Sequence, residues 1–251
     1  MSNRDDFFIG WADTPAPDRR FFLAAGVALM VGTAASAGAL ASRQAPVGSG
    51  MWNMGDVREW SGIITANPYP MLRTLDMGGD ARTVLLSCLG KCGVAAQIGA
   101  LEGQRVIVEG SVIQRGPHAM IAVAETLEWV RAAPDAPTDS RLLFPAPQPV
   151  DTVTLQGEIL DSKCWFGAMR PAEGKVHKAC AALCIRGGLP PAFFARNARG
   201  DGSLLIMTDQ LVAHGEDILP YVADPVELTG RVLRAGNILY LDAPTNALKR
   251  L

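Results

Sequence analysis

The sequence lacks the short motifs on which several common enzyme classes depend. It has no Gly-x-Gly-x-x-Gly run, no phosphate-binding loop and no Gly-x-Ser-x-Gly elbow, which argues against the usual nucleotide sites and against an α/β-hydrolase nucleophile. It also lacks Cys-x-x-Cys-His, so covalent c-type haem is not expected. The chain has three histidines, His118, His177 and His214. None of them is spaced from a nucleophile and a carboxylate in a way that suggests a catalytic site. We therefore favour a protein that is not an enzyme by itself.

Charge and aromatic content are also low. The net charge is −2 and the pI is about 5.9, which gives no basic footprint for nucleic acid. No long block of like charges suggests a disordered interaction tail. Aromatic residues make up 6% of the chain, whereas there are 26 glycines and 17 prolines. This composition favours short strands joined by many turns.

The N-terminal region contains an uncharged run at 21–42, preceded by two arginines. A membrane-spanning helix needs about 20 such residues, although this run is rich in Ala and Gly and therefore weakly hydrophobic. The segment Arg19-Arg20-Phe21-Phe22-Leu23 resembles a twin-arginine export signal, which in that family directs folded proteins out of the cytoplasm. An ordinary start-transfer anchor that happens to follow two arginines is the alternative.

Two fates of this segment fit the sequence. Cleavage near Ala39-Leu40-Ala41 would release a soluble protein. Retention would give a single-pass anchor in the bacterial cytoplasmic membrane, with the N-terminus in the cytoplasm and the main domains in the periplasm. We favour retention, because this topology resembles that of Rieske iron–sulfur proteins. The resemblance ends there, since the paired Cys-x-His boxes of a Rieske cluster are absent.

The rest of the chain divides at stretches rich in Gly, Ser, Pro and Ala. The expected segments are 1–20 (cytoplasmic), 21–42 (transmembrane anchor), 43–55 (linker), 56–131 (first domain), 132–150 (Pro-rich linker), 151–244 (second domain, with an insertion at 161–197) and 245–251 (tail).

The two domains show similar patterns. Each has a first strand containing one glycine, a middle strand, a short helical segment and a final hairpin with the pattern Val-x-x-x-Gly-x-Val. The expected strands are 60–64, 82–86, 105–113 and 119–123 in the first domain, and 155–160, 203–207, 226–233 and 238–241 in the second. This order resembles the small OB-fold barrel. The fold class is therefore all-β, with two OB-like barrels that arose by duplication, and an immunoglobulin-like sandwich is the weaker competitor.

The insertion carries the residues with the clearest chemistry. His177, Cys180 and Cys184 have a spacing that places them on one face of a helix, and Cys164 precedes them by a glycine-containing loop. Three thiolates and one imidazole would form a closed tetrahedral zinc site, and thiolates also suit copper(I) or an iron–sulfur centre. Lys175 and Lys178 are expected to favour the thiolate forms.

A structural disulfide from Cys164 to Cys180 or Cys184 is the alternative outside the cytoplasm. Cys88 and Cys92 form a second pair, which a disulfide explains better than a copper(I) clip. The nearby Glu158 and Asp161 have no evident shared task. His118 is expected to be solvated in a hairpin turn, and His214 to lie at a helix end.

Three functions remain open. The first is an accessory subunit of a respiratory or other membrane redox complex, with integral membrane proteins as partners. The second is a periplasmic protein that handles copper or zinc. The third is an electron-transfer protein with its own metal centre. The sequence does not choose the cofactor among zinc, copper and an iron–sulfur cluster.

Overall fold

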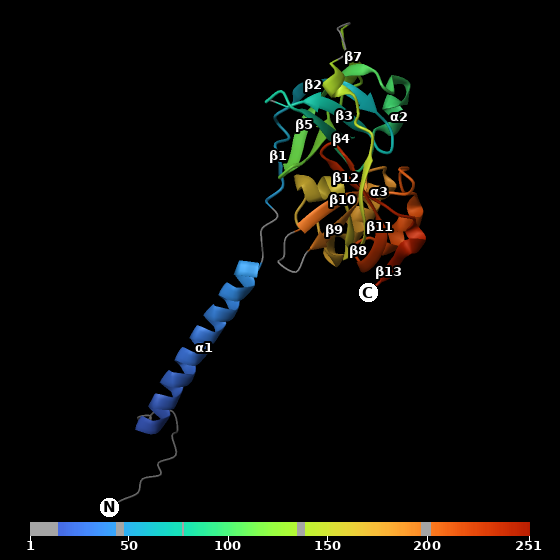
Figure 1. The fold of residues 1–251 in the computed structure, drawn as a ribbon. Helices are drawn as coiled ribbons and strands as arrows, with labels where there is room; N and C mark the ends of the chain where they lie inside the picture. Colours follow the sequence, from blue (N-terminus) through green and yellow to red (C-terminus); the bar gives the residue numbers. More distant parts are fainter. Residues whose placement is uncertain (1–14, 44–47, 77, 135–138, 197–201) are drawn as a thin grey trace, which may run out of the picture. The chain divides into compact units, whose positions relative to one another are not determined.

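The computed structural model describes residues 15–43, 48–76, 78–134, 139–196 and 202–251, and the chain forms two compact units, Met1–Ala45 and Pro46–Leu251. The described part of the first unit is one helix, α1 (Ala16–Arg43), which contains the uncharged run at 21–42 (Figure 1). Among the described residues, no helix is both long and apolar enough to cross a membrane. Most of the expected cytoplasmic segment 1–20 lies outside the described residues.

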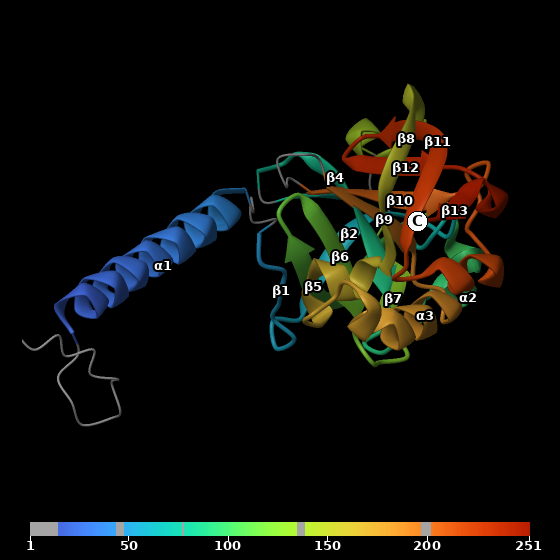
Figure 2. The same cartoon turned by 90° about the horizontal axis from the view of Figure 1, so that it is seen from below.

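The second unit is mostly β structure, which confirms the all-β class, and it contains two closed five-stranded barrels (Figures 1 and 2). The first barrel has the order β5-β2-β3-β4-β6 and closes where β6 pairs with β5. Only the pairing of β4 with β6 is parallel within this ring. Its elements are β2 (Arg58–Thr65), β3 (Met71–Leu75), β4 (Ala81–Ser87), α2 (Ala95–Ile98), η1 (Gly99–Leu101), β5 (Arg105–Arg115) and β6 (His118–Val123).

The second barrel repeats this arrangement. Its order is β11-β8-β9-β10-β12, it closes where β12 pairs with β11, and its parallel pair is β10 with β12. Its elements are β8 (Gln148–Asp161), β9 (Pro191–Arg196), β10 (Gly202–Thr208), η5 (Glu216–Tyr221), β11 (Pro225–Ala235) and β12 (Ile238–Asp242). The expected similarity of the two domains is therefore seen in their strand order.

The glycine in the first strand of each barrel has the same structural task. Gly62 in β2 pairs with Thr74, and Gly157 in β8 pairs with Ala195. A side chain at Gly62 would collide with the carbonyl of Arg73, and one at Gly157 would collide with that of Phe194. Glycine is therefore required at both positions by the close approach of the neighbouring strand.

Two of the barrel strands, β3 and β9, are missing from the sequence-based expectation. β3 follows Pro68 and Pro70, and β9 begins at Pro191, directly after Pro190. Proline is a turn signal in sequence, but it is accepted at the first residue of a strand. This is why the sequence indicated loops where the barrels have their second strands.

Described residues of both predicted linkers and of the predicted tail also form strands or helical turns of the second unit. β1 (Met51–Trp52), within the expected linker 43–55, pairs with β5. The expected linker 132–150 includes η2 (Ser140–Leu142) and the first residues of β8, and β7 (Val130–Ala132) ends at its first residue. In the expected tail 245–251, η6 (Thr245–Ala247) leads to β13 (Leu248–Arg250), which pairs with β11. Composition alone predicts spacers in these segments, but their backbones pair with strands of the barrels and so become part of the sheets.

The two barrels share a buried apolar core, so they are not independent domains joined by a spacer. The cluster takes side chains from both barrels, including Tyr69, Met71, Leu85, Ile113 and Met120 from the first and Leu160, Phe194, Leu204, Ile206 and Tyr240 from the second.

Polar contacts fix how the barrels meet. The Tyr69 hydroxyl donates to the Met207 carbonyl at 2.7 Å, and it accepts from the His214 backbone N–H at 3.2 Å. The Asn237 side chain accepts from the Thr83 N–H at 2.8 Å and donates to the Thr83 carbonyl at 2.9 Å. These contacts join residues far apart in sequence and give the interface one register.

Replacing Tyr69 by Phe is expected to lower the free energy of unfolding by about 1–3 kcal/mol, because the Met207 carbonyl and the His214 N–H lose their buried partner. Urea unfolding of the two proteins measures this difference. Tyr221→Phe is the matched control, because that half-buried ring lies under Arg250 at the surface, and it should change stability little. Equal effects of the two substitutions would show that the Tyr69 hydroxyl does not hold the barrels together.

Candidate functional site

The connection between β8 and β9 makes up most of the expected insertion 161–197. It is shorter than predicted, because the last part of that range forms the strand β9 (Pro191–Arg196) itself. It contains η3 (Cys164–Ala168), η4 (Lys175–His177) and α3 (Lys178–Arg186). Gly167 has φ 146°, which only glycine adopts readily, and it ends the first turn. The chain then returns so that α3 lies against β8.

Three thiols meet inside this connection. The sulfur atoms of Cys164, Cys180 and Cys184 lie within 4.8 Å of one another. Cys180 and Cys184 are about one turn apart on α3 and therefore share a face, while Cys164 comes from η3. Cys164 and Cys184 are buried and Cys180 is half-buried, and all three are free. The alternative of a disulfide from Cys164 to Cys180 or Cys184 is therefore not what the structure contains.

His177, the fourth predicted ligand, is buried in a neighbouring group. Its Nε2 lies 3.0 Å from Oδ2 of Asp161, and Asp161, Cys164 and His177 form a second set with ligand atoms within 4.8 Å of one another. Cys164 belongs to both sets. The predicted Cys3His ligands are therefore not gathered around one point, because the carboxylate holds the imidazole.

Two carboxylates that the sequence analysis left without a task hold the insertion in place. Asp161 is fully buried, and its Oδ1 accepts from the Cys164 N–H at 2.8 Å while its Oδ2 meets His177. Glu158 accepts from the Gly174 N–H at 2.8 Å, and burial raises the pKa of its carboxyl. Both residues lie towards the end of a strand, just before the cysteines. This position was the feature of the sequence from which their role in holding the insertion could have been predicted.

The cation nearest the thiols comes from the first barrel. Nζ of Lys91 donates to the Cys180 sulfur at 2.6 Å and lies 3.9 Å from the Cys184 sulfur. The hydrogen bond to Cys180 raises the pKa of Lys91. Lys175 and Lys178, the predicted partners, do not take this place. Lys178 pairs with Asp224 at 2.9 Å, and Lys175 is exposed beside a groove on the second barrel.

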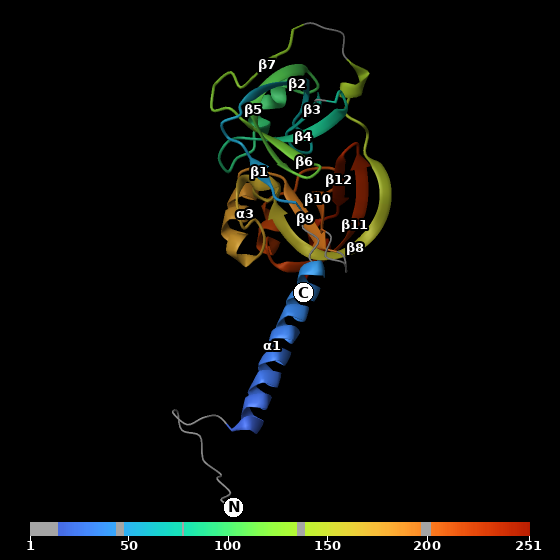
Figure 3. The same cartoon turned by 90° about the vertical axis from the view of Figure 1, so that its left-hand side faces the viewer.

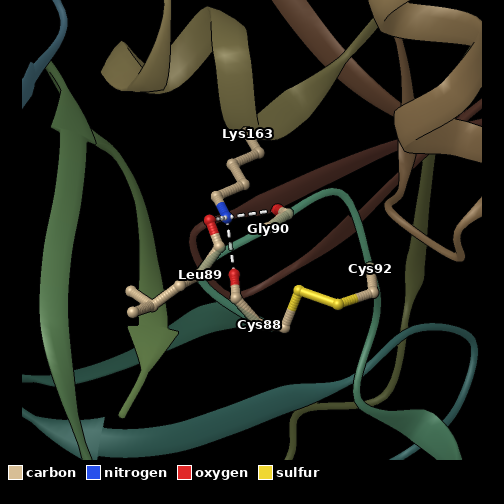
Figure 4. Close-up of a disulfide and its surroundings, with 5 residues drawn as sticks. All are labelled: Cys88, Leu89, Gly90, Cys92 and Lys163. Atoms are coloured by element: carbon tan, nitrogen blue, oxygen red, sulfur yellow. Dashed lines mark hydrogen bonds between the residues drawn. A yellow bond between two sulfur atoms is a disulfide. The ribbon is translucent and has the colours of Figure 1, made fainter. Parts of the chain in front are cut away.

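A second lysine, Lys163, links the insertion to the same part of the first barrel (Figure 4). Its buried Nζ donates to the carbonyls of Cys88, Leu89 and Gly90 at 2.5, 2.8 and 2.8 Å. Burial lowers the pKa of Lys163 to about 8, against the effect of Cys184 and other neighbours that favour the ammonium form. The three carbonyls supply the partners that a buried ammonium needs.

The thiols differ in acidity. The hydrogen bond between Cys164 and Cys184 lowers the pKa of the Cys184 thiol and raises the pKa of Cys164. Lys91 acts in the same direction on Cys184. Of these two thiols, Cys184 therefore becomes a thiolate more readily than Cys164, and the thiolate is the form that acts as a nucleophile and as a metal ligand.

Cys88 and Cys92 form a disulfide, which confirms the favoured prediction for this pair (Figure 4). The bond closes a turn in which the Cys88 N–H also donates to the Cys92 carbonyl at 3.0 Å. Cys92 is exposed and Cys88 is half-buried. The turn is the one that carries Lys91.

Of the two other histidines, His118 lies in different surroundings from those predicted, whereas His214 lies next to a helix end as expected. His118 is in β6, and its ring stacks on Phe166 and meets the edge of Trp165, so it is half-buried rather than solvated. Burial lowers its pKa. His214 precedes η5 and lies 3.3 Å from the Thr245 hydroxyl. The His118 ring therefore packs against the insertion of the second barrel, while His214 contacts the first barrel through its backbone N–H to Tyr69.

Comparisons with known proteins add no assignment, since no family model, no curated protein and no solved structure matches this chain.

Replacing Asp161 by Asn is expected to lower the free energy of unfolding by about 1–3 kcal/mol, because one amide cannot accept from both the Cys164 N–H and His177 as the carboxylate does. Urea unfolding provides the measurement. Asp151→Asn, an exposed position on the same strand, is the matched control and should change stability by less than about 0.5 kcal/mol. A D161N protein as stable as D151N would contradict the anchoring role of Asp161.

Proposed function

We propose that this protein binds copper(I) through the thiolates of Cys164, Cys180 and Cys184. The observation that supports this proposal is the meeting of three free thiols within 4.8 Å of one another, two of them buried, beside the ammonium group of Lys91. Close free thiols of this kind are suited to metal binding, because the thiolate is the ligand form and a neighbouring cation favours it.

The donor set favours copper(I) over zinc. Structural zinc sites almost always take four ligands, and His177, the predicted fourth, faces Asp161. The next sulfur is the thioether of Met169, 3.6 Å from Cys180. Thiolate and thioether ligands are soft and select copper(I). An iron–sulfur cluster normally takes four cysteines, whereas Cys88 and Cys92 are joined in a disulfide.

The position of the site supports metal handling rather than electron transfer. Cys180 is half-buried and Met169 is exposed, so an ion held by the three thiolates has a route to a partner through these two sulfurs. An all-sulfur environment also stabilises the reduced ion. In this reading the ion is cargo that the protein receives and passes on.

The location and the fold type are parts of the same proposal. The Arg19-Arg20 motif supports export, and a disulfide such as Cys88–Cys92 is typical of an oxidising compartment. The strand order of both barrels supports an OB-like type. Retention of α1 as a membrane anchor and membership of a respiratory complex as an accessory subunit stay predictions.

Anaerobic titration of the metal-free protein with copper(I), in competition with a chromogenic chelator, tests the proposal. We expect about one ion per chain, and we expect C164S, C180S or C184S each to weaken binding by more than about a hundredfold, because each removes a direct ligand. Leu183→Ser, an exposed position beside Cys184 on α3, is the matched control and should leave the affinity unchanged.

Two results would contradict the assignment. Free thiols that bind no copper(I) would exclude a metal site of this kind. If the protein binds zinc more tightly than copper(I) at matched buffering, the site is a zinc site rather than a copper site. X-ray absorption of the loaded protein then counts the sulfur ligands directly.

A further inference from the structure

The turn that contains the Cys88–Cys92 disulfide lies against the end of helix α3, next to the thiols. The Gly93 N–H donates to the Gly187 carbonyl at 2.7 Å. A side chain at Gly187 would collide with the Lys91 carbonyl, and one at Gly93 would collide with the Gly188 carbonyl. The two backbones therefore touch without side chains between them, and this turn forms one wall of the thiol cluster.

Two ammonium groups join this wall to the insertion in opposite directions. Lys91 extends from the turn to the Cys180 sulfur, and Lys163 extends from the insertion to three carbonyls of the turn. Each contact depends on the exact path of residues 88–93. A change in that path would move the Lys91 ammonium group away from the thiols and, at the same time, increase the exposure of the thiols.

The disulfide restrains this path from within the turn. It cross-links a short turn whose remaining internal restraint is the hydrogen bond from Cys88 to Cys92, and a cross-link restricts the open conformations of the segment that it closes. Because Cys92 and Lys91 are exposed, a reductant can reach the bond without unfolding the barrels. The thiols that the turn covers, by contrast, include the buried Cys184.

We propose that the Cys88–Cys92 disulfide is a redox latch on the cluster of Cys164, Cys180 and Cys184. With the bond intact, the turn keeps Lys91 on Cys180 and limits access to the buried Cys184. With the bond reduced, the turn moves away and the thiols become open to exchange. The latch is independent of the ion, and its effect on copper(I) release rests on the proposed function.

The reaction that opens the latch needs a dithiol reductant. A thiolate of that partner attacks one sulfur of the Cys88–Cys92 bond and forms a mixed disulfide, and the second thiol of the partner then displaces it. The partner loses two electrons and two protons and becomes a disulfide. The chain gains two electrons and two protons and holds two thiols at Cys88 and Cys92.

Pulse alkylation of the metal-free, full-length protein tests the latch without any metal. Oxidised and reduced wild type are exposed to iodoacetamide for timed intervals, and mass spectrometry gives the labelling rate of Cys180 and Cys184. We expect reduction to raise both rates by at least about tenfold, because the covering turn opens. Equal rates in the two forms would overturn the proposal.

Lys91→Met is the matched variant, since it removes the cation but keeps the disulfide. Reduction should still accelerate labelling in K91M, and loss of the acceleration would show that charge rather than cover controls the thiols, which also overturns the latch. The C88S/C92S double variant should label like reduced wild type without any reductant present.

A second measurement connects the latch to the ion. After loading with copper(I), transfer of the ion to a chelator should be about tenfold or more faster in C88S/C92S than in oxidised wild type, because a charge-assisted contact is lost. If wild type binds no copper(I), the proposed function fails, while the alkylation rates still decide whether the latch exists.

Discussion

The packing of the two barrels through one buried apolar core is the constraint on which the rest of the structure depends. Tyr69 and its neighbours from the first barrel are buried with Tyr240 and its neighbours from the second, and Figure 3 shows the two sheets stacked with α3 at the side. This packing brings residues 88–93 against the end of α3. Without it, the three cysteines of the second barrel would have neither a wall nor a cation beside them.

Much of the fold was predictable, because the final hairpin of each barrel has a clear period-2 pattern and a glycine at a fixed place. The predicted hairpins match β5 with β6 and β11 with β12. What the sequence could not reveal is the role of prolines and linkers. Pro191 begins a strand, and residues 148–150 extend β8, because their partners lie on strands that are distant in the sequence and leave no local pattern.

The candidate site was also predictable only in part. The spacing of Cys180 and Cys184 correctly placed both on one helical face, and the loop before them does bring Cys164 back. The ligand role of His177 was inferred from the same spacing, but a spacing does not show that Asp161 occupies its Nε2. Lys91 lies far from Cys180 in the sequence, so its place beside the sulfur could not be found from motifs. Lys178 is close in sequence, yet it pairs with Asp224.

The connection between the first and second strands has a different role in each barrel. In the first barrel it is the short segment between β2 and β3, and it carries Tyr69, which docks into the other barrel. In the second it is the long segment between β8 and β9, and it carries the cysteines. Two barrels with the same strand order therefore use this connection differently, one to contact the other barrel and one to carry the cysteines. The second barrel alone supplies the three thiols, but their cation and the turn beside them come from the first barrel, so the surroundings of the cluster exist only when both barrels are folded together.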